Sequence, residues 1–143
     1  MSSSPILKDK NAIVFGAGGS IGAAVAKEFA AEGAEVFLAG RTKSNVKEVA
    51  KEITADGGCA HAALVDAMDD TAVNEYIDDI AKRSGSIDIV FNAVGVPAKQ
   101  YGNGKSAVDL TIAEFMLPVT TVLKSNLSPR GQPPAIWSSS IQE

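Results

Sequence analysis

The stretch that most constrains the fold is an apolar run that leads directly into a cluster of glycines. After Ala-Ile-Val-Phe at residues 12–15 come three glycines at intervals of three, Gly16, Gly19 and Gly22. Apolar side chains then recur every four residues, which predicts a helix, at Ile21, Val25 and Phe29. A strand, a glycine turn and a helix N-terminus form a cradle for phosphate, because free backbone N–H groups and the helix dipole attract negative charge. The stretch predicts a pyrophosphate site, and the alternative is a left-handed turn that binds nothing.

The sequence disfavours two functions, nucleoside triphosphate hydrolysis and nucleic-acid binding. The phosphate loop of nucleoside triphosphatases ends in a lysine followed by a hydroxyl residue, and no such pair follows Gly22. The chain of 143 residues carries a net charge of −4, and its Lys and Arg residues are scattered. A nucleic-acid surface needs a basic patch, so we expect no nucleic-acid partner.

Cys59 and His61 are the only cysteine and the only histidine of the chain. One cysteine can form neither an internal disulfide nor a cysteine metal cluster. One histidine removes most metal sites and most Ser-His-Asp arrangements. We therefore expect no metal site and interpret His61 as an ordinary strand residue near Cys59.

The sequence also predicts where the protein works. Residues 1–5 lack the basic start and apolar core of a secretory signal. No apolar run approaches the length of a membrane span. We expect a cytoplasmic protein with no membrane partner.

Short apolar runs alternate with helical patterns along the chain. The runs predict four strands, at residues 11–15, 35–39, 60–65 and 87–91. Helices are predicted between and after them, at residues 20–32, at 44–55, from Asp69 or Asp70 to Gly85, and from a capping box at Thr111 and Glu114 to about Asn126. Pro118 either kinks the last helix or marks a later start.

This alternation predicts an α/β fold, a Rossmann-like doubly wound parallel sheet with helices on both faces. Right-handed crossovers favour the strand order 3-2-1-4, which is half of a complete fold of this kind. We expect residues 1–126 to form this domain and residues 127–143 to form an irregular tail. Ligands of such sheets bind at the carboxyl ends of the strands, where the glycine loop and the other polar segments all fall.

The end of the second strand indicates which dinucleotide fits. An NAD site usually presents an acidic residue about 20 positions past the glycine loop, to bind the ribose 2′-hydroxyl. This chain has Gly40-Arg41-Thr42 at that place and no carboxylate. Arg41 would pair with a 2′-phosphate and Thr42 could donate a hydrogen bond to it, which favours NADP(H). The alternative for Arg41 is a solvated surface residue at a helix start.

Two further strand ends carry candidate ligands. Asp66 follows the third strand, where a carboxylate can accept from the adenine amino group, or it can cap the next helix. Asn92 follows the fourth strand beside the expected cofactor. Its alternative is a structural amide that ties two strand ends together.

Together these segments resemble the N-terminal part of the short-chain dehydrogenase/reductase family, over residues 11–126. The resemblance is carried by residues 16–22, Gly40-Arg41-Thr42, Asp66-Ala67, Asn92-Ala93-Val94-Gly95 and Lys124-Ser125-Asn126-Leu127. Two residues depart from the family pattern: Phe15 stands where a threonine usually ties loop to strand, and Ser20 replaces a glycine of the loop.

The resemblance implies a site residue by residue, with NADP(H) as the preferred cofactor and NAD(H) as the alternative. The pyrophosphate would bind at Gly16, Gly19, Ser20, Ile21 and Gly22. The 2′-phosphate would meet Arg41 and Thr42, and the adenine would meet Asp66 and Ala67. The adenosine ribose would be flanked by Asn92, Ala93, Val94 and Gly95. Asn126 matches the helix asparagine that holds a water in the family's proton relay.

The same resemblance implies hydride transfer to or from a small-molecule carbonyl or alcohol. We also expect a homo-oligomer, because an unpaired strand edge and an uncovered apolar helix face favour self-association. The family uses a serine and a Tyr-x-x-x-Lys pair, expected beyond residue 130, and the sequence there contains no such set. Tyr101 and Lys105 have this spacing, but two glycines and an asparagine between them predict a loop. We therefore expect the cofactor-binding half of a reductase that is not catalytic alone, and the alternative is a non-catalytic dinucleotide-binding or regulatory module. A methyltransferase-like site is disfavoured, because it normally has an acidic residue where Gly40 and Arg41 stand.

The composition changes after Asn126 or Leu127, where Pro, Gly and Ser replace the helical pattern. Back-translated in a shifted frame, residues 128–142 can encode an alanine-rich helix of the kind the family has there. This suggests the hypothesis that a frameshift near residue 127 truncated a longer reductase. The alternative is a natural short protein with a disordered tail. In either case we expect an unpaired edge at the fourth strand, an uncovered apolar face on the last helix, and self-association.

Overall fold

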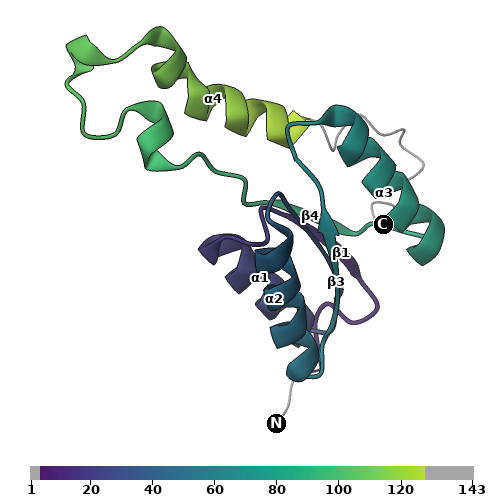
Figure 1. The fold of residues 1–143 in the computed structure, drawn as a ribbon. Coiled ribbons are helices and arrows are strands. Elements are labelled where there is room, and N and C mark those ends of the chain that lie inside the picture. Colours follow the sequence, from purple (N-terminus) through teal and green to yellow (C-terminus); the bar gives the residue numbers. More distant parts are fainter. Residues whose placement is uncertain (1–3, 128–143) are drawn as a thin grey trace.

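The structure, a computed structural model, describes residues 4–127 of the chain (Figure 1). Within them the strands form one parallel sheet of order β3-β2-β1-β4, which confirms the predicted topology. The strands are β1 (Asn11–Phe15), β2 (Glu35–Gly40), β3 (Cys59–Leu64) and β4 (Ile89–Asn92). Their bounds differ from the prediction by at most two residues. The irregular tail is predicted for residues 127–143, but Leu127 is still helical, and residues 128–143 lie outside the described residues.

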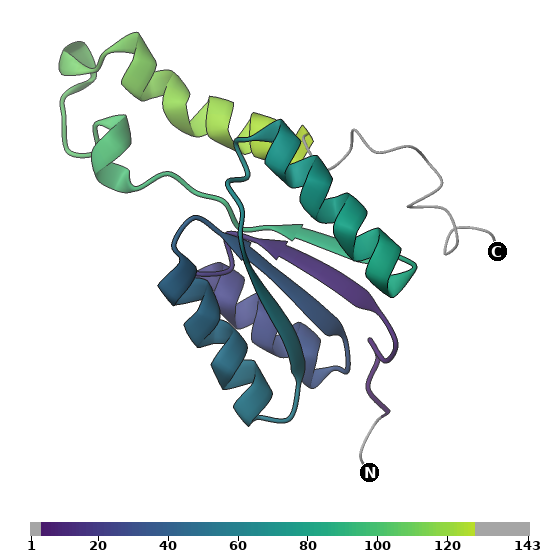
Figure 2. The same ribbon diagram turned by 45° about the vertical axis from the view of Figure 1, so that its right-hand side comes forward.

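Helices cover both faces of the sheet (Figure 2). On one face α1 (Ser20–Ala31) and α2 (Lys43–Ala55) pack against β1 and β2. On the other face α3 (Asp70–Ser84) closes a second core with the opposite side chains of the same two strands. The sheet thus separates two hydrophobic cores, and β1 and β2 contribute to both.

Burial falls toward the edges of the sheet. Every residue of β1 is buried, whereas β3 has four exposed residues, Cys59, His61, Ala62 and Leu64. The predicted cover on both faces therefore holds for the central strands only. An edge strand has one neighbour and lies at the margin of each helical layer, which leaves its side chains open to solvent.

The face of α1 that meets the sheet is made of small residues. Its buried positions are Gly22, Ala26 and Ala30, one every four residues. The larger side chains that predicted the helix lie at the margin, and Ile21 is 68% exposed. Small residues let the helix approach the sheet closely, immediately after the glycine loop.

Helix starts agree with the predicted signals in most cases. Asp69 caps α3 by accepting hydrogen bonds from the N–H groups of Thr71 and Ala72. The capping box at Thr111 and Glu114 is present, with Thr111 N donating to Glu114 at 2.9 Å and Glu114 N donating to Thr111 Oγ1 at 3.1 Å. The following helix, α4 (Ile112–Leu127), runs through Pro118, so a later start at the proline is wrong.

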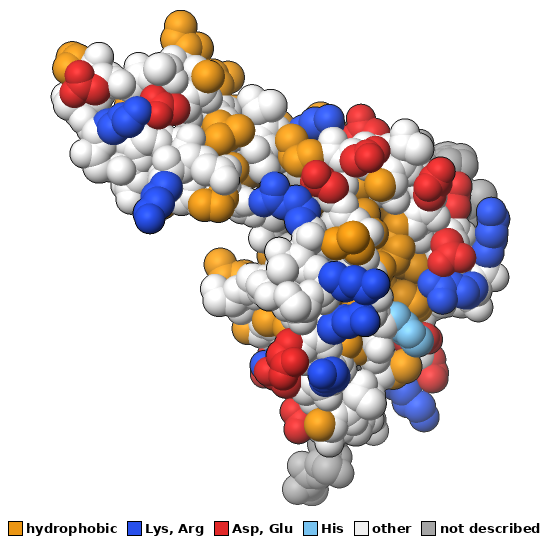
Figure 3. Space-filling model, viewed as in Figure 1, with side chains coloured by type: hydrophobic (Ala, Val, Ile, Leu, Met, Phe, Trp, Pro, Cys, Tyr) orange, Lys and Arg blue, Asp and Glu red, His pale blue; other side chains and the backbone are white. Residues whose placement is uncertain are grey.

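The chain leaves β4 by two short 3-10 helices, η1 (Ala98–Tyr101) and η2 (Ala107–Asp109), before α4. Figure 1 shows α4 extending away from the sheet above α3. Its only buried residues are Thr121 and Ser125, while large apolar side chains such as Phe115 are exposed. Figure 3 shows basic and acidic side chains intermixed over one face of the molecule. Among the described residues, no helix is both long enough and apolar enough to span a membrane.

Candidate nucleotide-binding site

The glycine loop is held by backbone contacts that leave no room for side chains at Gly16 and Gly22. Gly16 has a φ of +72°, and a Cβ there would lie 2.6 Å from the carbonyl oxygen of Ala93. A Cβ at Gly22 would overlap the carbonyl oxygen of Gly16. The backbone N–H of Gly19 donates to Gly16 O at 3.1 Å, and Ala17 N donates to Ala39 O at 3.1 Å. The loop is therefore tied to its strands without the threonine hydroxyl that Phe15 replaces.

Phe15 serves the core instead. Its side chain is 1% exposed and packs edge-on against Tyr76 of α3, with ring centroids 6.4 Å apart. The residue that departs from the family pattern thus joins β1 to α3 on the face of the sheet away from α1.

A cavity of about 540 Å³ opens at the carboxyl ends of the strands. Nine residues predicted for the cofactor line it: Gly16, Gly19, Arg41, Thr42, Asp66, Ala67, Ala93, Val94 and Gly95. The structure therefore brings together segments from four separate strand ends. This is the size and setting of a small-molecule site in a doubly wound sheet.

Four predicted residues do not line the cavity: Ser20, Ile21, Gly22 and Asn92. Gly22 lies against the backbone of Gly16, and this close contact is possible because Gly22 has no side chain. Ser20 and Ile21 are exposed at the start of α1. α1 itself begins at the loop with no side-chain cap on its first N–H groups, since its N-cap is Gly19.

Arg41 and Thr42 lie at the rim, exposed, between β2 and α2. Within residues 4–127, Arg41 forms no ion pair, so its guanidinium has no carboxylate to neutralise it. Gly40 packs against Val46 so closely that a Cβ would lie 2.7 Å from a Val46 methyl. The backbone before Arg41 is thus fixed against α2, which sets the rim position of the arginine.

Asp66 lies in the turn between β3 and α3 and does not cap the helix. Its carboxylate accepts a hydrogen bond from the N–H of Met68 at 2.9 Å, and the cap is Asp69. The capping alternative for Asp66 is therefore wrong. A carboxylate bonded to its own turn is held in place at the cavity wall.

Asn92 joins β4 to a helix rather than to another strand. Its Nδ2 donates to Ser125 Oγ at 2.9 Å, and its Oδ1 accepts from the N–H of Val94 at 2.9 Å. Ser125 is 1% exposed and lies one turn beyond Thr121, which lines the cavity. A signal for this face is present in the sequence, since Leu117, Thr121 and Ser125 recur every four residues. The larger apolar residues of α4 obscured it.

The cavity residues that were not predicted from the sequence lie beside the predicted segments. They are Gly18, Asn45, Val46, Val65, Met68, Val96, Pro97, Gln100 and Leu117, with Gly40 and Thr121 as described above. Asn126, the predicted relay residue, does not line the cavity. It is exposed, and its Nδ2 donates to Val122 O at 2.8 Å within α4.

Comparison with known proteins identifies the family of the chain. The family model for short chain dehydrogenases matches residues 10–127. The uncharacterized oxidoreductase YxbG of Bacillus subtilis is 38% identical over 90 residues, which are 63% of this chain and 33% of that protein. A metagenomic short-chain oxidoreductase in complex with NADP is 29% identical with a TM-score of 0.78, over 93% of this chain and 58% of that one.

A short chain dehydrogenase from Burkholderia cenocepacia, also in complex with NADP, is 30% identical with a TM-score of 0.73. The match covers 87% of this chain and 49% of that one. The chain thus spans between a third and three fifths of the length of these three proteins. The matched residues contain the glycine loop and every strand end that borders the cavity. The protein belongs to the short-chain dehydrogenase family.

Proposed function

We propose that the chain binds NADP(H) in the cavity at the carboxyl ends of the strands. The observation that carries the proposal is Arg41 at the rim, exposed and without a carboxylate beside it among the described residues. A guanidinium presents paired N–H donors that match a phosphate, whereas a ribose 2′-hydroxyl is better recognised by an acidic side chain. Thr42 adds a hydroxyl at the same place.

The rest of the cavity supports the same ligand. The glycine loop offers free N–H groups at the start of α1 for the pyrophosphate. Asp66 and Ala67 line the wall where the adenine would lie, and Ala93, Val94 and Gly95 line the part where the ribose would lie. Two of the structural relatives are described as complexes with NADP.

Replacing Arg41 with alanine tests the proposal. Charge-assisted hydrogen bonds contribute about 1.5–3 kcal/mol, so we expect R41A to weaken NADPH binding by roughly 10- to 100-fold. NADH affinity should change less than about twofold, since NADH lacks the phosphate. Isothermal titration calorimetry with both dinucleotides measures this. The control is K47A, which removes the same charge from an exposed position of α2 outside the cavity. Equal affinities of the unmodified protein for NADH and NADPH would contradict the proposal.

We further propose that the family's reaction, hydride transfer between the dinucleotide and a small carbonyl or alcohol, is not completed by these 143 residues. The reaction needs a tyrosine whose pKa is lowered so that it can exchange a proton at neutral pH. The chain has two tyrosines. Burial against Phe15 and its neighbours raises the pKa of Tyr76, which is the opposite of what the reaction needs.

The second tyrosine, Tyr101, does not share a helical face with Lys105. Gly102 and Gly104 between them have φ values of +74° and +89°, so the segment is a loop, as the sequence predicts. Lys105 is bound by Glu114 at 2.5 Å, and this contact, together with the hydrogen bonds from Thr111, lowers the pKa of Glu114 to about 2. The environments of Tyr76 and Tyr101 therefore favour the alternative of a non-catalytic dinucleotide-binding module.

In an absorbance assay at 340 nm we expect no NADPH oxidation above background with a panel of aldehydes and ketones. Carbonyl-dependent turnover would contradict the proposal.

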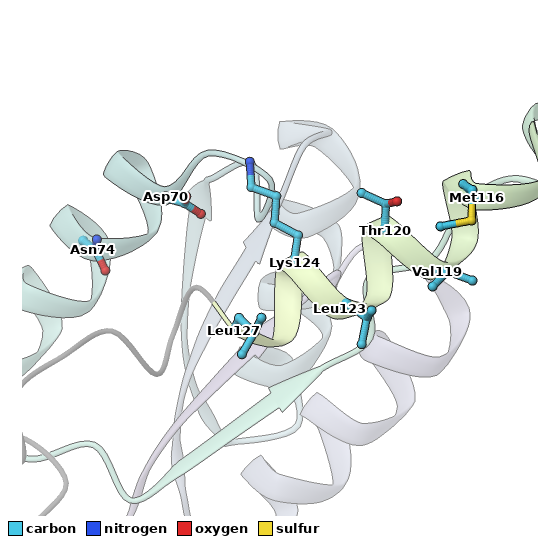
Figure 4. A pocket seen from close by; sticks show the side chains of 8 residues that line it. All are labelled: Asp70, Asn74, Met116, Val119, Thr120, Leu123, Lys124 and Leu127. Atoms are coloured by element: carbon cyan, nitrogen blue, oxygen red, sulfur yellow. The ribbon is translucent and has the colours of Figure 1, made fainter. Parts of the chain in front are cut away.

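The exposed face of α4 supports a proposal of self-association. An apolar hollow of about 590 Å³ lies between α3 and α4 (Figure 4). Its α4 side is lined by Met116, Val119, Leu123 and Leu127, and Leu123 is 59% exposed. Contiguous apolar surface of this kind is normally covered by another protein surface.

Light scattering during size exclusion measures the oligomeric state. We expect a dimer or a larger species at 100 µM, and a shift toward monomer in L123E. The control is K51E on the outer face of α2, which adds an acidic residue away from the apolar face. A monodisperse monomer of the unmodified chain at high concentration would count against this proposal.

A further inference from the structure

Three side chains with metal-ligating atoms meet at the end of the sheet opposite to the nucleotide cavity. Glu35 is the first residue of β2, and Cys59 and His61 lie at the start of β3. In the parallel register Glu35 pairs with Cys59, and Phe37 pairs with His61. Alternate residues of a strand point to the same side, so the three side chains share one face of the sheet.

Their polar atoms converge on one nitrogen. His61 Nε2 lies 2.7 Å from Glu35 Oε1 and 3.7 Å from Cys59 Sγ. All three ligand atoms lie within 4.8 Å of one another. The imidazole stacks on Phe37 with ring centroids 5.0 Å apart and an interplanar angle of 21°. Stacking restricts the ring, which keeps Nε2 directed at the carboxylate and the sulfur.

The arrangement is not that of an activated cysteine nucleophile. In such a relay the base contacts the nucleophile through one ring nitrogen and its orienting carboxylate through the other. Here Nε2 contacts both partners. Partial burial raises the pKa of the Cys59 thiol, and the negative charge of Glu35 raises it further, whereas a nucleophile needs a lowered pKa. A divalent cation among the three atoms would reverse this effect, because it stabilises the thiolate.

We propose that Glu35, Cys59 and His61 bind a divalent cation of the zinc type, with water in the fourth position. Zn²⁺ takes sulfur, nitrogen and oxygen ligands tetrahedrally, at about 2.3, 2.0 and 2.0 Å. That geometry separates sulfur from nitrogen by about 3.5 Å, close to the 3.7 Å between Cys59 Sγ and His61 Nε2. The carboxylate oxygen must retreat from 2.7 Å to about 3.3 Å, which a rotation of the Glu35 side chain provides.

Entry and charge also suit a cation. The side chains of His61 and Glu35 are 45% and 40% exposed, so an ion reaches them from solvent. On binding, the thiol of Cys59 releases its proton to solvent. The proton that His61 Nε2 shares with Glu35 also leaves, and the ring takes a proton from water at Nδ1, so that neutral Nε2 can bind the metal in place of its hydrogen bond. The ion would join the exposed edge strand β3 to β2 and so hold the edge of the sheet. This inference is independent of nucleotide binding, which takes place at the other ends of the strands.

Cobalt titration of the full chain, without an affinity tag, tests the site. A Co²⁺–thiolate bond gives a charge-transfer band in the near ultraviolet, and Cys59 is the only cysteine, so the band reports this site alone. We expect the band to saturate at one Co²⁺ per chain and to disappear when Zn²⁺ is added, because thiolate sites prefer zinc. Absence of the band, or saturation at one Co²⁺ per two chains, would overturn the proposal.

Variants separate a three-ligand site from binding to the thiol alone. Loss of a ligand should weaken Co²⁺ binding by at least the roughly 10- to 100-fold that loss of an outer-shell partner costs. We expect that weakening in E35Q and H61A, no band in C59S, and unchanged affinity in E28Q, the matched control on an exposed turn of α1. Circular dichroism checks that each variant is folded. If E35Q and H61A bind Co²⁺ as tightly as the unmodified chain, the three residues do not form a metal site.

Discussion

Replacing Gly22 with alanine is expected to abolish dinucleotide binding and to destabilise the fold. A Cβ at this position would overlap the carbonyl oxygen of Gly16 and lie 2.9 Å from its carbonyl carbon. Both atoms belong to the backbone of the phosphate loop, so no side chain can move aside. Alanine would favour the helix by about 1 kcal/mol, but overpacking in a close-packed region costs about 3 kcal/mol or more.

The net loss, about 2 kcal/mol or more, should lower the midpoint of thermal unfolding by at least about 5 °C. Differential scanning fluorimetry with and without NADPH measures both effects. The matched control is G19A. A Cβ at Gly19 would meet only Gly16 O, at an ordinary 3.5 Å, so this variant should fold like the unmodified chain. Gly19 lines the cavity, so G19A should weaken NADPH binding all the same. Equal stability of G22A and G19A would show that the close approach does not matter.

Replacing Phe15 with alanine is expected to give the second large effect, a loss of about 3–5 kcal/mol in the free energy of unfolding. Phe15 is 1% exposed and packs edge-on against Tyr76, so its removal leaves a cavity between β1 and α3. The loss is large compared with the 5–15 kcal/mol of stability typical of a domain.

Urea denaturation followed by circular dichroism gives the free energy. F15T restores the residue that the family usually has and should also destabilise the protein, because its hydroxyl enters an apolar core. I21A is the control, since Ile21 is 68% exposed and surface substitutions of this kind change stability by about 0.5 kcal/mol or less. A loss below about 1 kcal/mol in F15A would contradict the packing described here.

The sequence was sufficient for the topology because its signals are local. Each strand is a short apolar run, each helix has its own start or stop residue, and chirality then restricts the order of the strands. The same reasoning located Arg41 and Asp66, because the carboxyl ends of parallel strands share one edge. Side-chain choices within a turn were harder to predict. Asp66 and Asp69 are three residues apart and have identical side chains. Only the backbone conformation decides that Asp69 is the cap of α3.

Contacts between distant segments could not be predicted from spacing. Asn92 and Ser125 are 33 residues apart, and their hydrogen bond depends on how α4 returns to the end of β4. The large apolar residues of α4 are exposed, in agreement with the uncovered apolar face that the sequence predicts, and the side toward the sheet is formed by Thr121 and Ser125. The cluster of Glu35, Cys59 and His61 could not be predicted for the same reason, since only the register of β2 and β3 places Glu35 beside the other two residues.

The attachment of α4 has a consequence for how the protein opens. Among the described residues, its polar links to the sheet side include the Asn92–Ser125 bond and the bond from Lys124 Nζ to Met68 O, at 2.9 and 2.8 Å. The central strands are instead clamped between two cores. The amide hydrogens of β1 and β2 should therefore exchange with deuterium only through global unfolding, and those of α4 through a separate opening of lower free energy. Both links lie next to the nucleotide cavity. A ligand that restricts the motion of the cavity rim would therefore also slow amide hydrogen exchange in α4.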